Sequence, residues 1–174
     1  MTQQPINQDT INAAVWSACD TFRGTVDPSI YKDYVLTMLF LKYISDVWQD
    51  HYEVYAREHG DHPELITELL KNERFVLPPS ANFYALHAAR HQPGNGERID
   101  KALHAIEETN ITKLRDVFQD ISFNSTKLGD EAQKNDILRH LLEDFAKPEL
   151  NLRPSRIGLL DVIGNAYEFL IKNF

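Results

Sequence analysis

One stretch, from Asp27 to Gly60, constrains the fold more than any other part of the 174-residue chain. Asp27 is a favourable N-cap, and Pro28 suits the first helical position, where its missing N–H costs no hydrogen bond. Gly60 stands where a helix C-cap would fall, and no residue between these signals breaks a helix. The stretch therefore predicts one helix over about 28–59, which at 1.5 Å per residue is roughly 48 Å long.

The middle of this predicted helix is apolar on almost every side. Between residues 35 and 44, only Thr37 and Lys42 interrupt the apolar sequence. A helix that is apolar all round is buried all round. We therefore expect it to be the central helix of an all-α domain, with the other helices packed around it.

Helical periodicity and capping residues predict further helices, and no segment alternates as a strand does. Residues 75–77 precede two prolines and are predicted to be extended. We expect a single all-α domain over residues 1–174. Its further helices are expected over about 9–23 (ended by Gly24), after a cap at Asp61, after a cap at Ser80, over about 97–109, over about 130–146, and from about 160 to the end. The last helix is still fully patterned at Phe174, which suggests that the chain was cut from something longer.

Composition places the chain in a reducing compartment and away from membranes. Its single cysteine, Cys19, cannot form an intramolecular disulfide. The N-terminus lacks the features of a signal peptide, and the richest apolar window, over 35–41, is far shorter than the roughly 20 residues of a membrane span. We therefore expect a cytoplasmic protein. Its net charge of −8 excludes the broad basic surface of many nucleic-acid-binding proteins.

Catalytic and metal-binding patterns are missing from the sequence. The histidine pairs His87 with His91 and His59 with His62 match no zinc-ligand spacing, so we expect no metal site. The run 94–96 lacks the third glycine of a phosphate-binding loop and is predicted to be a turn. Likewise, the prolines at 78–79 lack the flanking residues of the amino methyltransferase loop. We therefore expect neither catalytic nor cofactor-binding residues in this chain.

Two local groups of basic residues could contact phosphates. The first comprises Arg90, Arg98 and Lys101, which surround the glycine-rich turn, and these three are our candidate DNA-binding residues. The second comprises Lys147, Arg153 and Arg156, in a late link between helices. The alternative for both groups is ordinary solvated surface charge.

The run from Ile11 to Asp50 resembles a known family. Three runs carry the resemblance: Trp16–Gly24, Tyr31–Leu36 and Leu39–Asp46, the last reading Leu-Phe-Leu-Lys-Tyr-Ile-Ser-Asp. Together they look like the N-terminal domain of type I restriction–modification methylation subunits. Weaker matches, at 75–81, 99–107 and 164–170, follow in the family's order, so the resemblance covers essentially the whole chain.

The resemblance implies a function for the full subunit and a partial one for this chain. The full subunit would transfer a methyl group from S-adenosylmethionine to the N6 of adenine in a specific DNA sequence. Its catalytic domain would follow Phe174, so this chain alone would be inactive and would hold no cofactor. The helical domain would help assemble the specificity subunit and a second methylation subunit around DNA, with a restriction subunit in the full complex.

Two other functions stay open from the residues alone. The first is a free-standing helical protein–protein interaction adaptor without enzymatic activity. The second is a small metal-dependent enzyme that uses the histidines, which the missing ligand spacing disfavours.

Overall fold

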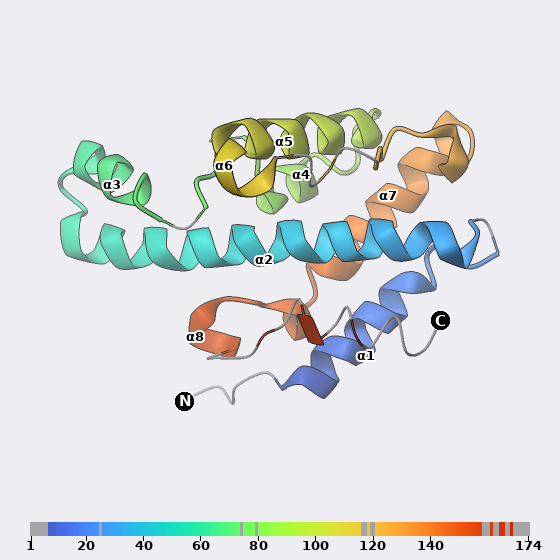
Figure 1. The fold of residues 1–174 in the computed structure, drawn as a ribbon, viewed down its shortest axis with the longest axis horizontal. Helices are drawn as coiled ribbons and strands as arrows, with labels where there is room; N and C mark the ends of the chain where they lie inside the picture. Colours follow the sequence, from blue (N-terminus) through green and yellow to red (C-terminus); the bar gives the residue numbers. More distant parts are fainter. Residues whose placement is uncertain are drawn as a thin grey trace.

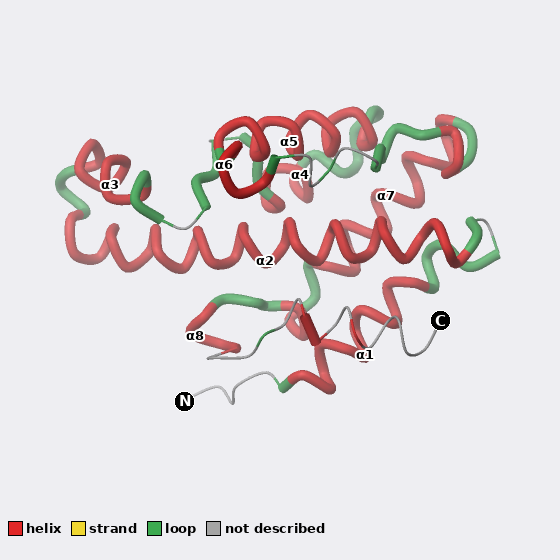
Figure 2. The backbone as a smooth tube through the Cα atoms, viewed as in Figure 1, coloured by secondary structure: helices red, strands yellow, loops and turns green. Residues whose placement is uncertain are grey.

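The computed structural model describes residues 7–24, 26–73, 75–78, 80–115, 118, 121–157, 161, 164, 165 and 168. Within these ranges the chain is helical and contains no strand, as Figure 2 shows, which confirms the predicted all-α class. The α-helices are α1 (Gln8–Cys19), α2 (Pro28–His59), α3 (Pro63–Leu70), α4 (Phe83–Ala88), α5 (Asn95–Thr109), α6 (Ile111–Leu114), α7 (Glu131–Phe145) and α8 (Pro154–Ile157); two short 3-10 turns are η1 (Thr126–Leu128) and η2 (Pro148–Leu150).

Helix α2 is the axis of the fold and has the predicted bounds. It runs for 32 residues without a break, a length of about 48 Å. The carbonyl of Asp27 accepts the amides of Ile30 and Tyr31, which starts the helix at Pro28. In Figure 1, α3 to α6 lie on one side of α2, and α1 and α8 lie on the other.

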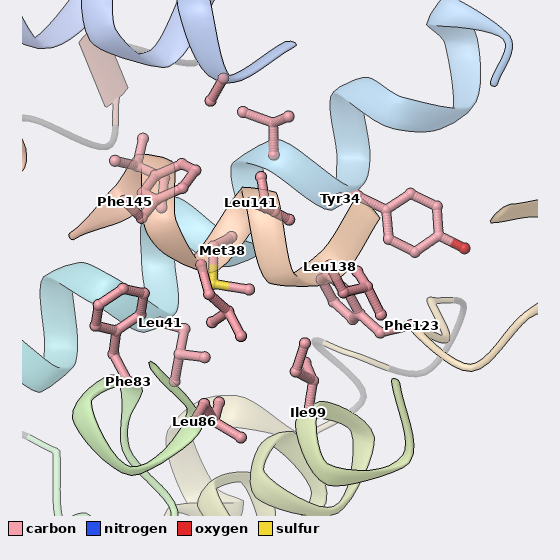
Figure 3. Close-up of a cluster of buried hydrophobic side chains, with 14 of the residues drawn as sticks. Tyr34, Met38, Leu41, Phe83, Leu86, Ile99, Phe123, Leu138, Leu141 and Phe145 are labelled. Carbon is pink, nitrogen blue, oxygen red and sulfur yellow. The ribbon is translucent and has the colours of Figure 1, made fainter. Parts of the chain in front are cut away.

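Helix α7 crosses α2 and joins the two sides into one core (Figure 1). Figure 3 shows Met38 and Leu41 of α2 beside Leu138, Leu141 and Phe145 of α7. Other side chains in this core come from α4, α5 and the loop before η1. All of them are at most 4% exposed: Tyr34, Met38, Leu41, Phe83, Leu86, Ile99, Phe123, Leu138, Leu141 and Phe145. The apolar middle of α2 is therefore buried by helices from both sides, as its sequence predicts.

The turn predicted over 94–96 reaches only to Gly94, because Asn95 and Gly96 already belong to α5. Backbone conformation explains the first glycine and close packing the second. Gly94 has a φ of +86°, which L side chains rarely adopt. At Gly96, an added Cβ would lie 2.5 Å from the carbonyl oxygen of Phe123. Helix α5 begins at Asn95 directly after this turn, two residues earlier than predicted.

Several predicted helix ends were wrong by a few residues. Helix α1 ends at Cys19, and tight turns with i to i+3 hydrogen bonds continue the chain to Gly24. Helix α1 begins at Gln8, one residue before the predicted start, and its N-cap is Asn7. The N-caps of α3 and α4 are His62 and Asn82, in place of the expected Asp61 and Ser80. The helix predicted from residue 160 lies outside the described residues, apart from 161, 164, 165 and 168.

Candidate functional site

Three polar side chains lie buried on α2, in the run that carries the family resemblance. Lys42 is 5% exposed, Ser45 is fully buried and Asp46 is 2% exposed. Burying a charge is costly unless it is paired and hydrogen-bonded. The partners of these residues therefore show what the run does in the fold.

Asp46 collects three donors from three separate segments. Its carboxylate accepts hydrogen bonds from the ammonium of Lys42, from the hydroxyl of Tyr84, and from the backbone N–H of Leu152 at 2.8 Å. Lys42 also donates to the carbonyl of Leu150 at 2.7 Å. Its ammonium lies 5.4 Å from the centre of the Phe83 ring, within the range of a cation–π contact. The buried charges are thus mutually compensated.

The same face of α2 continues to hold the late segment one and two turns further on. Asp50 accepts from the backbone N–H and the hydroxyl of Ser155, at 3.2 and 3.1 Å. Glu53 pairs with the guanidinium of Arg153 at 2.7 Å. We call the four α2 residues at this helical spacing, Lys42, Asp46, Asp50 and Glu53, the polar seam. The polar seam fixes residues 150–155 along the central helix.

Burial shifts the pKa values of two groups at the polar seam. Desolvation lowers the pKa of Lys42 below its ordinary value of 10.5, against the opposing effect of the Asp46 carboxylate. Desolvation, together with the charge of Asp46, raises the pKa of Tyr84 well above its ordinary value. Tyr84 therefore stays protonated and keeps donating to Asp46.

A cavity of about 360 Å³ adjoins the polar seam. Its walls come from α2, from α4 and from the link after α7. The lining residues are Lys42, Asp46, Phe83, Tyr84, His87, Ala146, Lys147, Pro148, Asn151 and Arg153. Two members of the second basic group identified in the sequence, Lys147 and Arg153, thus meet beside the buried ion pair.

The three predicted DNA-binding residues differ in their hydrogen-bond partners and in their exposure to solvent. The guanidinium of Arg98 donates to the carbonyls of residues 89, 92 and 93, at 2.9, 3.0 and 2.6 Å, and so fastens the turn between α4 and α5. Arg90 pairs with Glu143 of α7 at 3.2 Å. Lys101 is 75% exposed and pairs with Glu97, one turn back on α5. Contact of these three residues with DNA stays a prediction, and Lys101 has the most accessible charge of the three.

The polar seam was not predicted from the sequence. Its only local sign was Lys42 inside an apolar run, with Asp46 four residues later on the same helix face. In the part of the chain that the structure describes, no group of three or more histidine, cysteine or carboxylate side chains is placed to hold a metal ion. None of the described helices combines the length and apolar character needed to cross a membrane.

Comparison with known proteins identifies the family. Residues 11–145 match the family described as the HsdM N-terminal domain. The chain belongs to the HsdM N-terminal domain family. The resemblance in the sequence is thereby confirmed, and the polar seam lies within the matched region up to residue 145 and pairs with the segment just beyond it.

Two relatives extend this result. The chain is 26% identical over 200 residues to the type I restriction enzyme MpnII methylase subunit of Mycoplasma pneumoniae, an alignment that covers 94% of this chain and 34% of that protein. It also shares the fold of the crystal structure of a type I restriction–modification system methyltransferase subunit from Streptococcus thermophilus. There the TM-score is 0.74 at 23% identity, over 96% of this chain and 38% of that one. The HsdM N-terminal domain described here thus spans about a third of the length of each relative.

Proposed function

We propose that this chain is the N-terminal assembly and DNA-clamp domain of a type I restriction–modification DNA methyltransferase subunit. In the full subunit, a catalytic domain following residue 174 transfers a methyl group from S-adenosylmethionine to the N6 of adenine. The domain acts in the cytoplasm, with DNA, a specificity subunit, a second methylation subunit and a restriction subunit as partners. Membership of the HsdM N-terminal domain family and the similarity to a type I restriction enzyme methylase subunit support this proposal.

The polar seam is the observation that carries the assembly role. The run at 39–46, which carries the resemblance, supplies buried and fully hydrogen-bonded groups, and these are poorly suited to act on a substrate. Lys42 and Asp46 instead hold a segment more than 100 residues away in the chain. Residues 150–155 are therefore held rigidly against α2. Such an attachment suits a domain that fixes the position of the catalytic domain proposed to follow it.

The proposed role divides the work between domains, and this division can be tested. We expect the 174-residue chain to show neither S-adenosylmethionine binding by calorimetry nor methyl transfer to DNA. The full subunit should do both when combined with its specificity subunit. A full subunit that lacks residues 1–157 should still bind the cofactor but should fail to assemble with the specificity subunit by size-exclusion chromatography.

Two results would overturn the proposal. Cofactor binding by the 174-residue chain alone would place the cofactor site in this domain, whereas the proposal places it in the domain that follows residue 174. A natural coding frame that stops soon after Phe174, without a glycine-rich cofactor motif and an Asn-Pro-Pro-aromatic loop, would instead leave a free-standing helical adaptor.

A further inference from the structure

We infer that the cavity beside the polar seam binds a phosphate group, supplied either by the DNA backbone or by a free nucleotide. The DNA source rests on the proposed function, whereas the site itself rests on the cavity's own chemistry. The cavity has a volume of about 360 Å³, which is large enough for a phosphate and for part of the molecule that carries the phosphate.

The charge on the cavity wall is opposite to that of the whole chain. The chain has 26 acidic residues and 18 lysines and arginines. In contrast, the charged residues that line the cavity are Lys42, Lys147 and Arg153, with Asp46 as its one carboxylate. His87 also lines the cavity, but burial lowers its pKa below the ordinary value of 6.5, so its imidazole is neutral at pH 7. The sequence predicts phosphate contacts for Lys147 and Arg153, but only the fold joins them to Lys42 and His87.

Asp46 compensates only Lys42, with which it forms a buried ion pair. The positive charge left on the cavity wall therefore belongs to Lys147 and Arg153. The carboxylates that pair with Lys147 and Arg153 are Asp144 and Glu53, and neither lines the cavity.

Lys147 is the residue best able to take a new partner. Its ammonium lies 3.5 Å from Asp144, and its side chain is 53% exposed. Exposed ion pairs of this kind contribute little free energy, so exchange of Asp144 for a phosphate costs little. Arg153 offers a guanidinium, whose fork of N–H donors matches phosphate oxygens. A phosphate suits this wall because its several acceptor oxygens can meet donors from more than one side chain.

Titration followed by NMR tests the site directly. We would add sodium phosphate to the isotope-labelled 174-residue chain while chloride holds the ionic strength constant. We expect saturable shifts confined to the amides of the cavity, around residues 146–153. Lys147→Glu should weaken the apparent Kd at least about tenfold, the loss of one charge-assisted contact.

A matched control separates this effect from general electrostatics. Lys71 is 60% exposed and pairs with Glu68 at the same i, i+3 spacing as Lys147 with Asp144. Lys71→Glu changes the net charge equally but lies outside the cavity, so it should leave the phosphate Kd within about twofold. Equal weakening by both variants, or the absence of saturable shifts, would overturn the inference.

Competition then identifies the source of the phosphate. Displacement by a short DNA duplex assigns the site to the nucleic-acid backbone, and displacement only by adenosine monophosphate assigns it to a nucleotide. Either result supports a phosphate site. Failure of the titration would leave the assembly role intact, because that role is measured separately through association with the specificity subunit.

Discussion

Replacing Asp46 with asparagine should remove one charge from the centre of the polar seam while keeping the side-chain shape. The amide oxygen can still accept from Tyr84 or Leu152, but the ammonium of Lys42 loses its counter-charge. Lys42 is 5% exposed, so water in the adjoining cavity reaches little of its ammonium and can replace only a small part of the lost counter-charge. Breaking a buried pair by removing one partner costs about 3–5 kcal/mol.

The cost of deprotonating Lys42 sets an upper limit on this loss of stability, and the limit is of similar size. Lys42 can escape the cost of an unpaired charge by losing its proton in the folded state. Because its ordinary pKa is 10.5, deprotonation at pH 7 costs about 5 kcal/mol. The Asp46→Asn variant should therefore lose about 3–5 kcal/mol of unfolding free energy and roughly 10 °C of melting temperature.

Chemical denaturation across pH provides the assay. In the variant, the folded state lowers the pKa of Lys42 below its unfolded value. The penalty is therefore largest at neutral pH and shrinks as pH rises towards 10.5, where the unfolded lysine also becomes neutral. A double-mutant cycle with Lys42→Met should show strong coupling, because the second substitution removes the unpaired charge.

Two outcomes would refute this reasoning. A loss of less than about 1 kcal/mol in Asp46→Asn would mean that water reaches the pair as it does at an exposed ion pair. A penalty that does not shrink at high pH would mean that the lost free energy comes from hydrogen bonds to Tyr84 and Leu152, with no contribution from the uncompensated lysine.

Three further substitutions test other parts of the fold. Gly96→Ala should lose about 1–3 kcal/mol of unfolding free energy, because its Cβ would lie 2.5 Å from the carbonyl of Phe123; an unchanged denaturation midpoint would mean that the loop at Phe123 moves away easily. Burial raises the pKa of the Cys19 thiol from 9.0 to about 11. The unfolded thiol therefore ionises first, and wild-type stability should fall by up to about 3 kcal/mol more than that of Cys19→Ala between pH 9 and 11; parallel pH profiles would contradict this. Asp130→Ala removes the capping box that Asp130 forms with Gln133 at the start of α7, which should lower the melting temperature by an amount equivalent to about 1 kcal/mol; a loss in the Gln133→Ala control but none in Asp130→Ala would be inconsistent with the cap.

Local sequence signals were sufficient for the central helix. Asp27, Pro28 and Gly60 gave the bounds of α2, and the apolar run between residues 35 and 44 gave its central place in the core. Helix starts and stops of this kind depend on residues within about four positions, so a sequence displays them directly. At the start of α3, local signals favoured Asp61 as the cap, whereas the structure has His62 there, without a side-chain cap hydrogen bond.

Contacts between distant segments decided the rest. Lys42 and Asp46 are four residues apart in the sequence, so their pairing is a local property. Their other partners, at 84 and 150–152, are distant in the sequence and could not be predicted from it. Local charge density likewise made Arg98 a candidate DNA contact, which stays a prediction, but could not show that its guanidinium donates to backbone carbonyls of the turn before α5.

The family and the helical architecture are therefore present in the sequence by itself, because periodicity, capping and short motifs are local properties. The polar seam and the basic cavity exist only in the tertiary structure. Each is made of charges that lie far apart along the chain, and their burial and compensation depend on which segments the packing of α2, α4 and α7 brings together.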